Sequence, residues 1–192
     1  MRRFFVLARM FLLLHLRDRE VLFWFFAFPI GLLLILGTLF ATGQESAGAA
    51  AWLVAGVIVM NLLAAGLNGD AVWLASARDR GILQRVRATP LPPAHLIGAY
   101  VAVRLALVMV QSALILATGM LAFGARPALA ALPGMAALIV GGGLVFLLLG
   151  QAIGAVTSSA GAANQINNAL FFPLLFLSNL VIRLDGLPAT WI

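Results

Sequence analysis

Cysteine and lysine are absent from this sequence of 192 residues, and only 9% of the residues are charged. The absence of cysteine excludes a disulfide scaffold, a cysteine-ligated zinc or iron–sulfur site and a cysteine nucleophile. The absence of lysine excludes a phosphate-binding Gly-x-x-x-x-Gly-Lys-Ser/Thr loop and a Schiff-base enzyme. About a quarter of the residues of a soluble domain are charged, whereas 64% of this chain is hydrophobic. We therefore expect a chain that folds in lipid.

Five apolar stretches are long enough to cross a bilayer as helices, which takes about 20 mostly apolar residues. They cover residues 21–41, 51–75, 96–123, 134–157 and about 166–182. Breaks with the composition of loops separate them, at residues 42–46, 76–93, 124–133 and 157–168. The alternation of polar and apolar residues that is typical of strands does not occur. The sequence predicts an all-α integral membrane protein with five transmembrane helices.

The arginines indicate the orientation, because positively charged short loops stay on the cytoplasmic side of the membrane. Five arginines precede the first span and four lie between the second and third spans, whereas only Arg126 and Arg183 fall in the other loops. The amino terminus and residues 76–93 are therefore predicted to be cytoplasmic. Five spans then place the carboxyl terminus outside, where Trp191-Ile192 ends the chain as if a further span should follow.

Residues 1–20 combine arginines on one side of a helical wheel with phenylalanines and leucines on much of the rest. This pattern predicts an amphipathic helix that lies in the cytoplasmic interface. The alternative is a signal peptide with Arg2-Arg3 as its basic region. Arg9 interrupts the apolar run and no small-residue cleavage site follows, so we favour the interfacial helix.

Asp70 and Arg104 are the only formal charges well inside the predicted spans. Charges inside a membrane are costly and therefore suggest a function, here a gating or ion-coupling pair. The alternatives are a structural ion pair, or an arginine that extends to water. Because one such pair is far from a proton relay, we favour the structural role.

Other polar and glycine-rich features have structural explanations. His15 and His95 have no second ligand at metal-binding spacing, so no metal site is predicted. The amides at 164–168 fit helix capping and interfacial hydration at least as well as substrate binding. Gly150 and Gly154 form a small-xxx-small step that predicts close helix packing. No catalytic constellation can be assembled, and the chain is not predicted to be an enzyme.

The loop at residues 76–93 is the most informative segment. Ile82, Leu83 and Val86 recur at helical spacing among arginines, and prolines follow. This predicts a short amphipathic helix on the cytoplasmic side. Such a stripe suits docking to a partner protein, whereas the alternative is simply a solvated, positively charged loop.

This segment resembles the membrane subunits of ABC-2 type transporters, which place a Glu-Arg-Glu-x-Gly-Thr-Leu-like stretch and an Ala-Thr-Pro-Leu-like turn between spans two and three. Here the stretch reads Arg78-Asp79-Arg80-Gly81-Ile82-Leu83 and the turn reads Ala88-Thr89-Pro90-Leu91. A second similarity lies in Phe172-Pro173-Leu174, Phe176-Leu177-Ser178 and Leu184-Asp185-Gly186-Leu187-Pro188. The resemblance covers nearly the whole chain, but the sixth span that family members place after this element is missing.

The resemblance implies a permease subunit of an ATP-driven exporter in the cytoplasmic membrane, with no cofactor of its own, because ATP would bind to a separate ABC ATPase subunit. A second permease subunit would complete the path, and we expect no nucleic-acid partner. Few fixed charges and much aliphatic and phenylalanine surface favour an amphipathic or hydrophobic substrate such as a drug or lipid. Residues 1–192 would form one domain, divided into an interfacial helix at 1–20, spans at 21–75, a coupling loop at 76–93, spans at 94–182 and an outer segment at 183–192.

The resemblance also implies which residues are functional. The ATPase contact would consist of Arg78, Asp79, Arg80, Gly81, Ile82, Leu83, Gln84, Arg85, Val86 and Arg87. Substrate would meet Asn61, Phe171, Phe172 and Asn179 on spans two and five.

Two further readings of the sequence stay open. A secondary transporter would need midplane carboxylates or an inverted repeat of broken helices, and only Asp70 comes close. A truncated, inactive permease fragment would insert its spans without forming a closed path.

Overall fold

The computed structural model describes residues 2–40, 46–87 and 92–177, and these residues form helices without any strand. Four helical stretches in this part of the chain are long and apolar enough to cross a membrane, namely Arg19–Phe40, Gly48–Asp79, Ala94–Phe123 and Leu129–Val156. They match the first four predicted spans. The prediction of an all-helical membrane protein is confirmed for the described residues.

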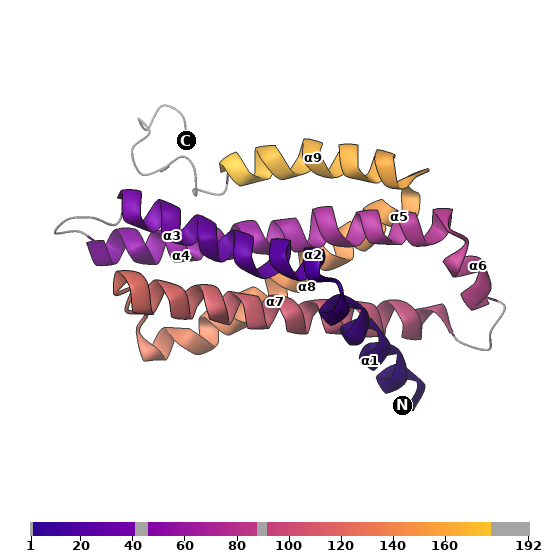
Figure 1. The fold of residues 1–192 in the computed structure, drawn as a ribbon, viewed down its shortest axis with the longest axis horizontal. Helices are drawn as coiled ribbons and strands as arrows, with labels where there is room; N and C mark the ends of the chain where they lie inside the picture. Colours follow the sequence, from indigo (N-terminus) through magenta and orange to yellow (C-terminus); the bar gives the residue numbers. More distant parts are fainter. Residues whose placement is uncertain (1, 41–45, 88–91, 178–192) are drawn as a thin grey trace.

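The chain begins with α1 (Arg2–Arg17), which lies at an angle to the long helices (Figure 1). It packs against α7 (Pro93–Phe123) through the buried side chains of Leu7 and Phe11. Phe5, on the opposite side, is exposed. An amphipathic helix therefore forms where the wheel pattern predicts one.

The first span consists of α2 (Arg19–Leu22), the π-helical segment η1 (Phe23–Ala27) and α3 (Phe28–Phe40). It starts at Asp18, whose Oδ1 accepts a hydrogen bond of 3.1 Å from the backbone N–H of Val21. This is the N-cap interaction that satisfies an otherwise free donor at a helix start. Asp18 thus separates α1 from the span.

The second span consists of α4 (Ser46–Leu63), the π-helical segment η2 (Ala64–Asp70) and α5 (Ala71–Asp79). The short helix α6 (Ile82–Arg87) follows. Between α5 and α6, Gly81 has a φ of +69°, and its N–H donates to the carbonyl of Arg78 over 2.9 Å. Glycine adopts this left-handed conformation without steric cost, which explains the sharp turn at this point of the motif.

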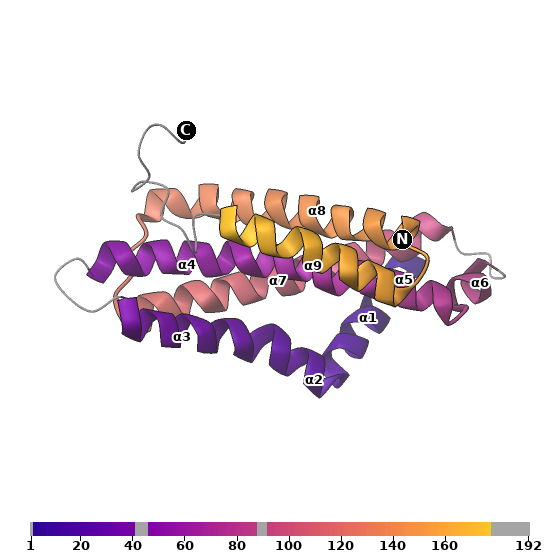
Figure 2. The same ribbon diagram turned by 90° about the horizontal axis from the view of Figure 1, so that it is seen from above.

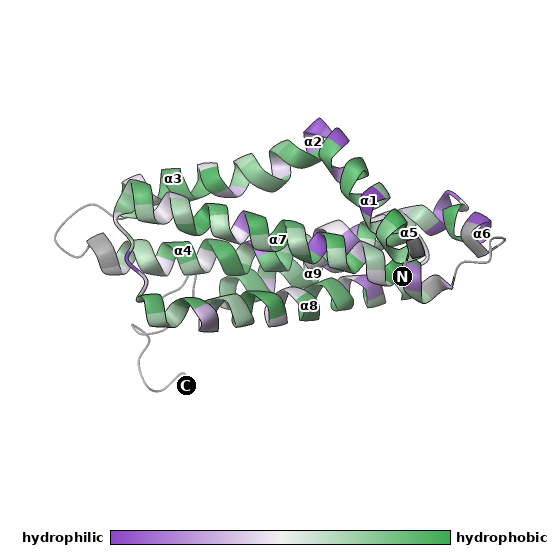
Figure 3. Ribbon diagram, turned by 90° about the horizontal axis from the view of Figure 1, so that it is seen from below, coloured by the Kyte–Doolittle hydropathy of each residue, from purple (hydrophilic) through white to green (hydrophobic). Residues whose placement is uncertain are grey.

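The remaining elements are η3 (Leu129–Ala131), α8 (Leu132–Val156) and α9 (Ala160–Leu177). The long helices run side by side, with α6 and the α8–α9 turn at the same end of the bundle (Figures 1 and 2). Hydrophobic residues cover most of the long helices, and hydrophilic residues gather around α2 and α6 (Figure 3). This distribution fits long helices that are immersed in lipid.

The loop predicted for residues 157–168 is wrong in its length, because α9 already begins at Ala160. Two side chains cap its first turn: Ser159 Oγ accepts from the N–H of Ala162, and Asp79 Oδ2 accepts from the N–H of Ala160, each over 3.1 Å. The capping and the packing of α9 against α5 override the weak helix propensity of its glycine and asparagines. The described part of the predicted fifth span, residues 166–177, lies in this helix.

Glycines let α8 approach the second span closely. A Cβ at Gly154 would lie 2.6 Å from the carbonyl oxygen of Ala71, and one at Gly150 would collide with the carbonyl of Gly66. Neither position has room for a side chain. The predicted small-xxx-small packing step is thus formed, and it positions α8 against η2 and α5.

Candidate functional site

A buried ion pair joins spans two and three. Nε of Arg104 lies 2.7 Å from Oδ1 of Asp70, and these residues are 4% and 0% exposed. Arg104 also donates from Nη2 to the carbonyl of Ala65 over 3.0 Å, and its guanidinium lies 5.2 Å from the ring centre of Phe25. The guanidinium charge is therefore compensated by a carboxylate, a carbonyl and an aromatic face. The sequence-predicted pair is brought together, in the arrangement of a structural ion pair.

Tyr100 completes this centre and was missed by the sequence analysis. Its hydroxyl donates to Oδ1 of Asp70 over 3.2 Å, and its ring stacks on Trp73 with the centroids 3.8 Å apart. Phe11 of α1 meets the same ring edge-on. The sequence could have indicated Tyr100, because it precedes Arg104 by four residues and therefore lies on the same helix face.

His15 lies on α1 beside this centre, with its ring tilted against Tyr100. Its Nδ1–H donates to the carbonyl of Phe11 over 2.9 Å. Burial lowers the pKa of His15, and the charge of Arg104 acts in the same direction, whereas the hydrogen bond to Phe11 and the charge of Asp18 oppose the shift. His15 is thus a packing residue that favours its neutral form. Among the described residues, no group of three His, Cys, Asp or Glu side chains could hold a metal ion.

The segment at the end of α5 makes contacts within the chain. Arg78 donates from Nη1 to the carbonyl of Ala155 over 2.8 Å, while Asp79 caps Ala160, so both residues hold the α8–α9 turn. Arg78 and Asp79, which the resemblance assigns to an ATPase contact, thus have an intramolecular role as well.

The apolar side of α6 is only partly open. Leu83 is half-buried and packs against the cluster formed by α1 and α7, so part of its apolar surface is covered within the chain. Ile82 is 45% exposed. Gln84 and Arg85 are exposed too, and so is Arg80 in the preceding turn. The side chains of Val86 and Arg87 lie outside the described part of the chain. The free surface of this segment is therefore centred on Ile82.

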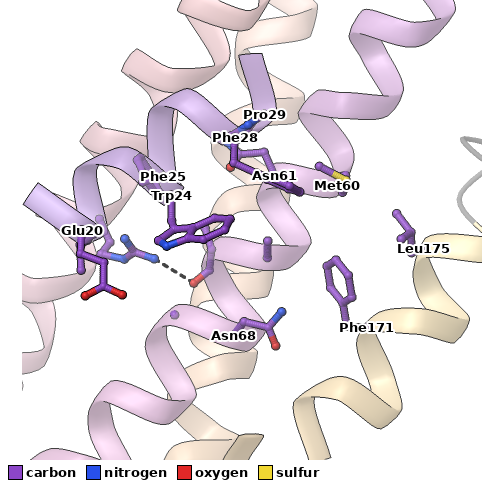
Figure 4. A pocket seen from close by; sticks show the side chains of 15 residues that line it. Glu20, Trp24, Phe25, Phe28, Pro29, Met60, Asn61, Asn68, Phe171 and Leu175 are labelled. Carbon is purple, nitrogen blue, oxygen red and sulfur yellow. Dashed lines mark hydrogen bonds between the residues drawn. The ribbon is translucent and has the colours of Figure 1, made fainter. Parts of the chain in front are cut away.

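A cavity of about 610 Å³ lies between the first span, the second span and α9. Trp24 and Phe171 line it from opposite sides, and Asn61 and Asn68 of the second span lie between them (Figure 4). Two of the predicted substrate contacts, Asn61 and Phe171, therefore share one cavity. Phe172 is 54% exposed and does not line it, and Asn179 lies outside the described residues.

The cavity contains residues that the sequence analysis did not select, above all Glu20, Trp24 and Phe28. These three are spaced by four residues, which places them on one helix face. Asn61 and Asn68 are spaced by seven and share a face for the same reason. These spacings could have indicated each helix face from the sequence. Nothing in the sequence, however, indicates that the face on the first span and the face on the second span meet.

The chain matches one protein-family model. The family model of the ABC-2 type transporter matches residues 2–192. No curated protein and no solved structure matches the chain. The match covers more than half of the chain and agrees with the four long apolar helices described above. The chain therefore belongs to the ABC-2 type transporter family, as a multi-pass membrane permease domain without ATPase motifs.

Proposed function

We propose that this chain is the permease subunit of an ATP-driven exporter that moves an amphipathic or hydrophobic substrate across the cytoplasmic membrane. The cavity between the first span, the second span and α9 carries the proposal. Its volume of about 610 Å³ is within the usual range for small-molecule sites. Its walls are mainly aromatic and aliphatic, with amides that can orient a polar group. Export as the direction follows from the resemblance to ABC-2 subunits.

Energy would come from a separate ABC ATPase subunit, because this sequence has no lysine for a nucleotide-binding loop. A second permease subunit would complete the translocation path. The surface centred on Ile82 is the proposed ATPase contact, with Arg80 and Arg85 pairing with acidic groups at its rim. Charges at the rim of an interface set register and association rate more than affinity.

Movement of the proposed ATPase contact on α6 would be transmitted to the cavity through α5. A force on α6 acts on the end of α5, where Arg78 and Asp79 hold the α8–α9 turn. The helix that starts at this turn, α9, supplies Phe171 to the cavity. A displaced coupling helix would therefore move one cavity wall.

The proposed topology has five spans and a cytoplasmic amino terminus. Its support is the arginine distribution and the position of α6 and the α8–α9 turn at one end of the bundle (Figure 1). A secondary transporter is less well supported, because Asp70 is already engaged by Arg104 and Tyr100. A carboxylate that couples transport to an ion gradient must bind and release that ion, and a carboxylate held by these two partners is poorly suited to do so.

The test compares two phenylalanines of α9. Phe171 lines the cavity, whereas Phe176 is 49% exposed and does not. Vesicles containing the chain and its ATPase subunit should accumulate a fluorescent amphiphile when ATP is added. Phe171→Ala should reduce the initial rate severalfold, and Phe176→Ala should leave it unchanged. Equal rates for the two variants would refute the cavity as the substrate path.

A further inference from the structure

The cavity has aromatic side chains on two of its walls, and Glu20 is the acidic residue among the described residues that line it. Trp24 and Phe28 form a tilted pair with centroids 5.9 Å apart, and Phe171 faces them from α9 (Figure 4). Glu20 lies one turn before Trp24 and lines the same cavity. Among the described residues, Glu20 has no ion pair. Glu20 is exposed, and none of the described cationic side chains lies within ion-pair distance of its carboxylate.

Arg104 also lines the cavity, but its charge is already engaged. The guanidinium pairs with Asp70, donates to the carbonyl of Ala65 and lies over the ring of Phe25. The ion pair has no net charge, so the charge that remains at the cavity is the negative charge of Glu20. The ring faces of Trp24 and Phe171 attract cations, and no arginine of the described residues covers them.

Two asparagines of the second span add polar groups to the cavity wall. Asn61 is 4% exposed, and within the described part of the chain its Nδ2 and Oδ1 of Asn68 have no hydrogen-bond partner. The side chains of Asn61 and Asn68 both line the cavity. They lie between the two aromatic walls (Figure 4).

We infer that the cavity binds a free organic monocation with an aromatic or aliphatic body, held by the aromatic walls and the carboxylate of Glu20. This inference deepens the proposed function, because it names the substrate class of the same cavity. A cation next to aromatic faces and one carboxylate gains both cation–π and Coulomb attraction. An anion of the same shape would meet the negative charge of Glu20 without compensation.

The experiment uses the whole purified chain in phosphatidylglycerol nanodiscs, with no ATP and no partner subunit. Binding of tetraphenylphosphonium and of tetraphenylborate, which have nearly the same shape and opposite charge, is measured by equilibrium dialysis. Uptake by protein-free discs of the same lipid is subtracted. The phosphonium should bind more tightly than the borate, and Glu20→Gln should weaken phosphonium binding about tenfold without weakening borate binding.

Two further variants separate the site from general effects. Trp24→Leu keeps an apolar side chain but removes the ring, and should weaken phosphonium binding about fivefold. Asp18→Asn removes a neighbouring acid that caps α2 and does not line the cavity. Since asparagine also caps helices, this variant should bind as the unmodified chain does. A loss in Asp18→Asn equal to that in Glu20→Gln would show a surface effect and overturn the inference.

Lipid is the other possible source of a cation. If phosphatidylethanolamine in the discs weakens phosphonium binding in proportion to its content, the ammonium headgroup occupies the site and the assignment to a free substrate is overturned. Equal binding by the Glu20→Gln chain, or borate binding as tight as phosphonium binding, also overturns it. Because the assay requires no transport, a negative result here leaves the transport test of Phe171 unaffected, and the reverse holds as well.

Discussion

Removal of the charge from Asp70 alone should destabilise the protein more than any other single neutralisation in the spans. Asp70→Asn leaves Arg104 buried at 4% exposure with only the carbonyl of Ala65 and the ring of Phe25 as charge-compensating partners. Loss of one partner of a buried pair costs about 3–5 kcal/mol. With about 2–4 °C of melting temperature per kcal/mol for a chain of this size, we expect a decrease of about 6–20 °C.

The reciprocal change should be milder. Arg104→Gln leaves the carboxylate of Asp70 with the hydroxyl of Tyr100 at 3.2 Å. A carboxylate can be neutralised by taking up a proton, whereas a guanidinium stays charged. The double variant Asp70→Asn/Arg104→Gln contains two amides that can bond to each other, and should recover most of the loss. Exchanging the two residues is a poorer control, because Asp70 lies at the close approach of the second span to α8, where even a Cβ added at Gly150 would lie 3.4 Å from the Cβ of Asp70, and an arginine is much larger than the aspartate it would replace.

The assay is the fraction of monodisperse protein that survives heating in detergent, measured by fluorescence-detected size-exclusion chromatography. Each variant is compared with the unmodified chain at the same expression level. We expect the double variant to lose much less stability than the sum of the losses of the two single variants. If the losses of the two single variants simply add in the double variant, the ion pair does not stabilise the fold in the way described.

Three other results follow from the structure. Gly150→Ala should lower the thermal stability by about 1–3 kcal/mol, because its Cβ would collide with the facing backbone, whereas Gly141→Ala, with open space at its Cβ, should be neutral in the same heating assay. The stability of the fold should fall as the pH decreases below 6.5, the usual histidine pKa. The pKa of His15 is lowered in the folded chain, so protonation favours the unfolded state. His15→Gln should remove this part of the pH dependence of the melting temperature. Ile82→Asp should abolish co-purification of the ATPase subunit while the chain stays monodisperse, because the side chain is 45% exposed. The control Gln84→Asp adds the same charge on the same short helix without removing an apolar contact. An equal loss of co-purification in Gln84→Asp would argue against an apolar contact at Ile82.

The parts of the fold that could be predicted from the sequence depend on composition and local chemistry. The apolar runs predict the first four spans because a bilayer selects helices of about 20 apolar residues. Gly81 and the apolar spacing around Ile82 predict the turn and the short helix α6. The proximity of Asp70 and Arg104 is also predictable, because both lie near the loop that joins consecutive spans.

The parts that could not be predicted depend on tertiary contacts. The π-helical segment η2 has no local sequence signal, although it sets how Asp70 and the carbonyl of Ala65 are presented to Arg104. The start of α9 depends on Asp79, 81 residues earlier in the chain, and so lies beyond any local pattern. The cavity depends on the meeting of the first span, the second span and α9. Its acidic residue, Glu20, lies at the start of the first span, where the sequence indicates only a polar helix end.

The two π-helical segments explain how α7 is held between the first and second spans. In lipid, a polar side chain must find a partner within the protein. Arg104 binds the carbonyl of Ala65 in η2, and Gln111, seven residues later on the same face of α7, donates to the carbonyl of Phe25 in η1. A π-helical turn alters the path of its backbone, and such turns are frequent at functional sites. The walls of the cavity formed by the first and second spans are thus tied to α7 by polar contacts at both segments. The opposite wall belongs to α9, which is anchored at its start by the cap from Asp79. Of the three walls, the one formed by α9 is therefore best placed to move when α5 is displaced.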